Sequence, residues 1–131
     1  MKTILHAGLA VLCLNSAAFA VTYECQMTKK DRSNWVPEAV QIIYEPSTGD
    51  VVVRDPISNH FLGGPASGAL DTDNDKRVTF KWDVKTTNSQ GQFTTMQYRA
   101  TIMKRNNSAR VTGKPLGYLN NYKSSGSCVV K

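Results

Sequence analysis

Two cysteines near the ends of the chain are the residues with the clearest chemical potential. Three roles compete for Cys25 and Cys128: a disulfide that closes the chain, a pair of metal ligands, or a lone lipidated or reactive thiol. A structural zinc site needs four Cys or His ligands at close spacing, and after residue 20 the sequence has these two cysteines and one histidine, His60. In an oxidising compartment, paired thiols persist as disulfides. We therefore expect Cys25 to be bonded to Cys128.

Residues that could support catalysis are few. A Ser-His-Asp triad would have to use His60, and the segment Gly64 to Gly68 places its serine one position too late for a G-x-S-x-G nucleophile turn. The run Asp71 to Asp75 begins like a calcium loop, but Lys76 stands where an EF-hand needs glycine, and Trp82 where it needs glutamate. An acidic turn is the simpler interpretation, and a weak surface calcium site is the alternative. We expect a protein that is not an enzyme and has no cofactor.

The first twenty residues have the features of a signal peptide. Lys2 precedes an apolar run from Ile4 to Leu14 that is too short to span a bilayer, and Ala18-Phe19-Ala20 forms an A-x-A cleavage site. A lipid anchor is not expected, because no cysteine follows this site directly. We expect export to the periplasm or the extracellular space, no transmembrane segment, and a single domain over residues 21–131.

Apolar and polar side chains alternate with a period of two, which predicts β-strands throughout the domain. The clearest strand is Arg77 to Lys85, and after a polar loop the run Thr95 to Lys104 repeats the alternation, so the two should pair as a hairpin. Four large inward side chains would either fill the core or line a cavity for a small ligand: Phe80, Trp82, Met96 and Tyr98. Their size favours a filled core.

A second hairpin is expected at Asn106-Asn107. Asparagine tolerates positive φ, so this pair predicts a two-residue turn. The resulting register places Ile102 opposite Val111 and keeps apolar residues opposite apolar residues.

A third hairpin is centred on Pro46 to Gly49, which predicts a four-residue turn that pairs Glu45 with Asp50. This register leaves Ile43 and Val52 as an apolar pair on the outer face. We expect a loop or a terminal segment to cover that pair.

Short strands over Thr22 to Met27, Ser67 to Asp71 and Ser127 to Lys131 raise the expected total to seven or eight. The segment Asp55 to Gly68 is rich in glycine and proline and should form a long irregular connection. The expected class is all-β: a small antiparallel barrel or a two-sheet sandwich, with the disulfide joining its first and last strands.

The charges are divided between the two halves of the domain. Residues 31–75 carry a net charge of −6, whereas residues 76–131 carry +10. The expected strands gather six bases on one outer face: Arg77, Lys81, Lys85, Arg99, Arg110 and Lys114. Such a face either keeps the protein soluble or attracts an anionic partner.

In outline the chain resembles small periplasmic β-barrel proteins of bacteria, among them the C-type lysozyme inhibitors. The resemblance rests on the signal peptide, on Tyr23-Glu24-Cys25 and on Gly126-Ser127-Cys128, and the S-G-x-x-Y segment of the inhibitors is missing. A closer likeness is to uncharacterised exported proteins of the same size, in Trp35-Val36-Pro37, Asp55-Pro56, Gly63-Gly64-Pro65 and Lys114 to Tyr118.

These observations favour a non-catalytic exported binding module. Its basic face would engage an anionic envelope component or an acidic protein, and association between copies is also allowed. Nucleic acid is not an expected partner of an exported protein without a recognition motif. The alternatives are a small-ligand carrier and, from the resemblance, an inhibitor of an extracytoplasmic enzyme.

Overall fold

The computed structural model describes residue 8 and residues 19–131, so nearly all of the expected signal peptide lies outside the described residues. Within them the elements are β1 (Val21–Lys29), β2 (Ala39–Glu45), β3 (Asp50–Arg54), α1 (Pro56–Leu62), β4 (Ala66–Asp73), β5 (Arg77–Thr87), β6 (Phe93–Met103), β7 (Ser108–Pro115) and β8 (Tyr122–Val130). No helix in this part of the chain is long and apolar enough to cross a membrane.

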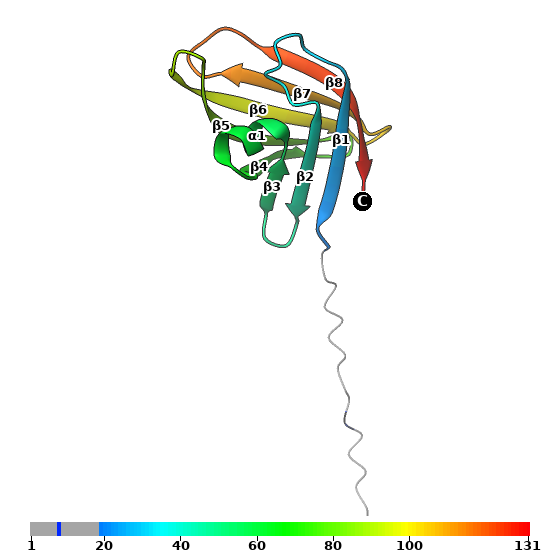
Figure 1. Cartoon of the computed structure of the whole chain (residues 1–131). Helices are drawn as coiled ribbons and strands as arrows, with labels where there is room; N and C mark the ends of the chain where they lie inside the picture. The colour runs from blue at the N-terminus through cyan, green and yellow to red at the C-terminus, as the bar shows by residue number, and fades with distance from the viewer. Residues whose placement is uncertain (1–7, 9–18) are drawn as a thin grey trace, which may run out of the picture.

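The eight strands form a closed barrel in sequence order (Figure 1). Each strand is antiparallel to the next, and β8 returns to pair with β1. The expectation of an all-β fold is therefore confirmed, and of the two expected architectures it is the barrel. Closure leaves no free sheet edge.

The predicted disulfide joins the first strand to the last. Cys25 lies directly opposite Cys128 in the pairing of β1 with β8, with their Cα atoms 3.9 Å apart, and the two sulfurs are bonded. Three residues from the cysteines, the backbone N–H of Thr22 donates to the carbonyl of Lys131 at 3.0 Å. The N–H of Lys131 donates to the carbonyl of Thr22 at 2.8 Å. Covalent and hydrogen bonds thus close the barrel at the same seam.

Large side chains fill the interior of the barrel. Phe80, Trp82, Met96 and Tyr98 are all buried. The Trp82 and Tyr98 rings stack with centroids 5.5 Å apart, and Phe80 contacts the ring of Tyr23 at 5.3 Å. The four side chains considered as a cavity lining therefore form a packed core, as their size favoured.

The hairpin of β6 and β7 differs from its predicted register. Ile102 lies opposite Ala109, not Val111, because the turn contains four residues and not two. Asn107 has a φ of 58°, and its N–H donates to the carbonyl of Met103 at 2.8 Å. The shift is by an even number of residues, so every side chain keeps its predicted face.

The hairpin of β2 and β3 has the predicted register, with Glu45 opposite Asp50. Ile43 and Val52 lie opposite each other on the outer face, as expected, but both remain partly exposed. The pair is therefore only partly covered.

A short helix occupies the first half of the connection that was expected to be irregular between Asp55 and Gly68. The Asp55 carboxylate caps α1 by accepting the backbone N–H groups of Ile57 at 2.8 Å and Ser58 at 2.9 Å. Pro56 occupies the first turn, and Gly63 ends the helix with a φ of 71°. These are common start and stop residues, but seven helical residues are too few to show a helical period.

The helix and the loop between β1 and β2 cover one end of the barrel (Figure 1). Trp35 of this loop stacks on Phe61 of α1 with ring centroids 6.3 Å apart. From inside the barrel, the Tyr98 hydroxyl donates to the Trp35 carbonyl at 2.7 Å. Burial, and secondarily the charge of Asp55, raises the pKa of Tyr98, so its phenol stays protonated and remains a donor.

Candidate anion-binding site

The six bases predicted to share one face do lie on the outer surface of β5, β6 and β7. The register that sets this face places Lys81 opposite Arg99 and Arg110 opposite Thr101. All six are exposed: Arg77, Lys81, Lys85, Arg99, Arg110 and Lys114. Their neighbours on the adjoining strands divide them into three groups.

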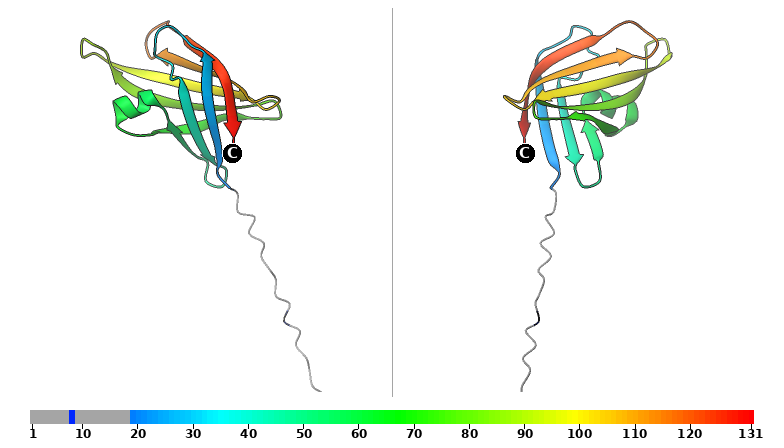
Figure 2. Two further views of the ribbon diagram at one scale, coloured as in Figure 1. Left: turned by 45° about the vertical axis from the view of Figure 1, so that its right-hand side comes forward. Right: turned by 180° about the vertical axis from the view of Figure 1, so that it is seen from behind.

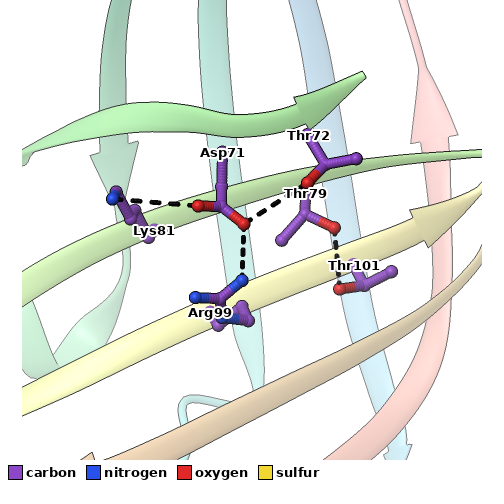
Figure 3. Close-up of polar contacts among 6 residues, drawn as sticks. All are labelled: Asp71, Thr72, Thr79, Lys81, Arg99 and Thr101. Atoms are coloured by element: carbon purple, nitrogen blue, oxygen red, sulfur yellow. Dashed lines mark hydrogen bonds and ion pairs between the residues drawn. The ribbon is translucent and has the colours of Figure 1, made fainter. Parts of the chain in front are cut away.

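The first group is neutralised by an acidic residue from β4. Asp71 accepts a hydrogen bond from the Arg99 guanidinium at 2.6 Å, and its other oxygen lies 3.8 Å from the Lys81 ammonium (Figure 3). The pairing of β4 with β5 shifts between Leu70 and Thr72, which makes Asp71 the extra residue of a β-bulge. Bulges redirect side chains, and here the bulge directs a carboxylate towards two cations.

The contact with Arg99 also sets the ionisation of Asp71. The hydrogen bond from Arg99 is the largest cause of a lowered pKa, with smaller contributions from the charges of Arg99 and Lys81. Asp71 is therefore charged at neutral pH, and Lys81 and Arg99 have a permanent counter-ion.

The second group lines a groove. Arg77 and Arg110 border a hollow of about 620 Å³ on the outer face, together with Lys29 from the end of β1. None of these three cations forms an ion pair with an acidic residue in the described part of the chain. The groove therefore concentrates positive charge without a counter-ion from the protein.

Hydroxyl groups complete the lining of this groove, with one each from β1, β6, β7 and β8: Thr28, Thr101, Ser108 and Ser125. The pairing of β1 with β8 shifts between Met27 and Lys29, so Thr28 is a second bulge residue. Cations and hydroxyls together are the donors that phosphate, sulfate and carboxylate groups accept.

The third group lies towards the end of the barrel that α1 covers. Lys85 is opposite Thr95, and Lys114 is opposite Gln97, near the loops that connect β5 to β6 and β7 to β8. These lysines do not line the groove. The predicted face is thus one surface with two separate sets of unpaired cations.

The acidic run Asp71 to Asp75 covers the end of β4 and the start of the turn to β5. Asp73 pairs with Lys104 at 2.5 Å, and this hydrogen bond is the largest cause of the raised pKa of Lys104. Asn74 accepts the backbone N–H groups of Lys76 and Arg77 through its side-chain oxygen. The run therefore serves ion pairs and turn hydrogen bonds, and residue 8 and residues 19–131 contain no group of three or more potential metal ligands.

His60 lies in the last turn of α1 and is exposed. Its ring meets the edge of Phe61 at 4.7 Å. His60 is therefore a helical, solvent-exposed residue.

A smaller hollow of about 360 Å³ lies at the covered end of the barrel. Met96 borders this hollow, whereas Phe80, Trp82 and Tyr98 do not. The other lining is neutral and includes Trp35, Tyr118, Tyr122 and Asn120. This hollow suits a small uncharged ligand better than an anion.

Sequence reasoning missed the role of Asp71 as a counter-ion and the contribution of Lys29 to the groove. The position of Lys29 could have been predicted, because a disulfide from Cys25 to Cys128 already implies that β1 lies beside β8. Nothing in the sequence marks the bulge at Asp71, which exists only in the pairing with β5. Comparison of the chain with protein-family models, curated proteins and solved structures returned no match.

Proposed function

We propose that this chain is a non-catalytic exported binding module that holds an anionic group of a cell-envelope component in the groove formed by Lys29, Arg77 and Arg110. The observation that supports this most directly is the convergence of three unpaired cations on one hollow of about 620 Å³. On the same face, Lys81 and Arg99 are different, because Asp71 forms ion pairs with both of them.

The contrast between these neighbouring groups argues for a ligand. A surface kept basic for solubility alone needs no arrangement of hydroxyls around its cations. In the groove, two guanidinium groups can bind an oxyanion through paired hydrogen bonds, and the hydroxyls of Thr101 and Ser125 add neutral donors. An acidic protein would use the same charges but would not need a concave site.

Binding to the groove should depend strongly on salt, because its cations are solvent-exposed and are screened over about 10 Å at 0.1 M ionic strength. Export is part of the proposal and rests on the sequence of residues 1–20. It is tested by the N-terminal sequence of protein recovered from outside the cytoplasm, which should begin at Val21.

A charge-reversal experiment tests the groove. Immobilised heparin and immobilised polyphosphate serve as probes for sulfated and phosphorylated polyanions. Arg77→Glu combined with Arg110→Glu should lower the salt concentration that elutes the protein. The matched control is Arg32→Glu combined with Arg54→Glu, which makes the same change in net charge at two exposed residues outside the groove.

The two double variants separate a site from general attraction. A larger loss of retention for the groove variant than for the control supports the proposal. Equal losses would mean that net charge alone attracts the polyanion, and the groove proposal would then be wrong. Near-ultraviolet circular dichroism of both variants checks that the barrel is intact.

A small-ligand carrier is the second candidate, and the hollow beside Met96 is what favours it. Its three aromatic side chains and neutral amides fit a compact polar molecule without charge. Native mass spectrometry of gently purified protein should then show a retained mass that Asn120→Leu releases. Only ligand-free protein from several expression hosts would contradict this second candidate.

A further inference from the structure

Besides Leu62 of α1, which is 45% exposed, four large apolar side chains project into solvent at the end of the barrel covered by α1: Phe93, Leu116, Tyr118 and Leu119. Phe93 is 85% exposed, Leu116 is 58% exposed and Tyr118 is 56% exposed, while Leu119 is fully exposed. We call these four residues the apolar rim. Exposed single apolar residues are common, but four at one end of a small protein form a patch that favours contact with another surface.

The rim combines the first residue of β6, Phe93, with three residues of the loop between β7 and β8. The backbone N–H of Leu116 donates to the carbonyl of Thr95 at 2.8 Å, which places the start of the β7–β8 loop beside the start of β6. Phe93 is two residues before Thr95 on the same outer face. Figures 1 and 2 show the loops between β5 and β6 and between β7 and β8 at the same end of the barrel.

Local hydrogen bonds hold both loops in shape. The Asn88 side-chain oxygen accepts the backbone N–H groups of Gln90 at 3.0 Å and Gln92 at 2.9 Å. In the second loop the N–H of Tyr118 donates to the Pro115 carbonyl at 3.2 Å, and Gly117 supplies the positive φ of 85° that this turn requires. The apolar side chains are therefore presented by structured turns.

Three lysines lie near the rim, with Asp83 on the same outer face two residues before Lys85. Lys85 and Lys114 lie on the outer face just behind Phe93 and Leu116, and Lys123 follows at the start of β8. The sequence has no Asp or Glu after Asp83. Asp31 also approaches this end, where its carboxylate accepts the backbone N–H groups of Ser33 and Lys123.

From this arrangement we infer that the apolar rim docks onto the surface of an anionic lipid bilayer. Such a surface has negatively charged head groups outside and acyl chains beneath them. The apolar side chains of the rim would enter the acyl region, and the bordering lysines would contact the head groups. The charge complementarity favours a bilayer over a second copy of this chain, because two copies meeting at the rim would bring their lysines together. The inference is independent of the groove, which uses different residues.

Vesicle sedimentation tests this docking. The protein used is the oxidised chain from Val21 onward, which contains every strand and the disulfide. It should sediment with vesicles of phosphatidylcholine mixed with phosphatidylglycerol and stay in solution with phosphatidylcholine alone. Replacing Phe93, Leu116 and Leu119 together by serine should lower partitioning roughly 100-fold, since each side chain loses its contact with the acyl region.

Matched variants identify which part of the surface is responsible. Val129→Ser removes another exposed apolar side chain, 60% exposed and located on β8 away from the rim, and should leave partitioning unchanged. Lys85→Gln and Lys114→Gln should each weaken partitioning about fivefold, because a lysine near an anionic surface contributes about 1 kcal/mol. The double variant Arg77→Glu with Arg110→Glu measures how much of the partitioning depends on the groove.

A gain of signal provides a second measurement that does not rely on loss of binding. In Leu119→Trp, the new indole should shift its emission to the blue on addition of anionic vesicles, after subtraction of the parent signal from Trp35 and Trp82. Brominated acyl chains should quench it. Absence of both effects would overturn the inference.

Three other outcomes would also overturn it. The first is vesicle binding that is unaffected by the triple serine variant. The second is binding that the groove variant alone abolishes, which would support the proposed function and exclude the rim. The third is rim-dependent self-association in analytical ultracentrifugation without vesicle binding, which would identify a second copy of the chain as the occupant.

Discussion

Asp71 lies 2.6 Å from the Arg99 guanidinium because a β-bulge in β4 directs its carboxylate onto the outer face of the barrel. The same carboxylate is 3.8 Å from Lys81. One acidic residue therefore separates the paired cations in the middle of the face from the unpaired cations of the groove.

Asp71→Asn should increase retention on immobilised heparin, because it releases Lys81 and Arg99 from their counter-ion. Asp50→Asn makes the same charge change at the exposed first residue of β3, on another strand pair, and is the control. The salt concentration at elution should rise more for Asp71→Asn than for Asp50→Asn. Equal increases would contradict a local role of Asp71.

The ion pair of Asp71 and Arg99 also predicts a pH dependence. Since the folded-state pKa of Asp71 lies below its ordinary value of 3.8, the pair contributes stability above that value. The contribution should be lost as the pH falls through the lowered folded-state pKa. A carbon-detected NMR titration should find Asp71 titrating below the ordinary value, and in Arg99→Gln it should return towards it.

Reduction of the disulfide should strongly destabilise the barrel. The bond joins residues 103 positions apart, and on the chain-entropy model a loop of this size contributes roughly 4 to 5 kcal/mol. Urea unfolding of the oxidised protein and of Cys25→Ser/Cys128→Ser measures the difference. Oxidised protein should gain about 2 Da on reduction, whereas two reactive thiols in the native protein would refute the bond.

Tyr98→Phe should lower the free energy of unfolding by about 1 kcal/mol, because the carbonyl of Trp35 loses the hydroxyl donor that reaches it from inside the barrel. The raised pKa of Tyr98 adds a second signature. Its contribution to stability is complete below the ordinary value of 10.0 and should decrease as the pH rises above that value. Tyr98→Phe should show a smaller alkaline decrease, with the remainder due to the pKa of Tyr23, which burial also raises, whereas the exposed control Tyr118→Phe should retain the full decrease.

Gly126→Ala should prevent normal closure of the barrel. A Cβ atom at this position would lie 1.9 Å from the Gln26 carbonyl oxygen, so β8 would have to move away from β1. We expect the free energy of unfolding, measured with urea, to fall by more than about 2 kcal/mol. Gly64→Ala is the control, since its Cβ would meet no atom within 4 Å, and an equal loss there would contradict the explanation.

Several features could be predicted because they depend on side chains close in sequence. Alternation along Arg77 to Lys85 identified which side chains of β5 face the core, although Thr79 is also buried through its contact with Thr101 at 3.0 Å. The error in the Asn106-Asn107 turn moved the register by two residues and left the faces unchanged. The helix after Asp55 was missed because its cap residues are not accompanied by a detectable period.

The all-β class, the pairing of Cys25 with Cys128 and the outward direction of the six bases follow from the sequence alone. Three features become visible only once the strands are placed in space: the sheet closes, Asp71 neutralises two of those bases, and Lys29 joins Arg77 and Arg110 in a groove. The difference lies in the range of the interactions. Alternation is a property of one strand, whereas a groove, a counter-ion and an apolar rim depend on which strands and loops become neighbours when the barrel closes.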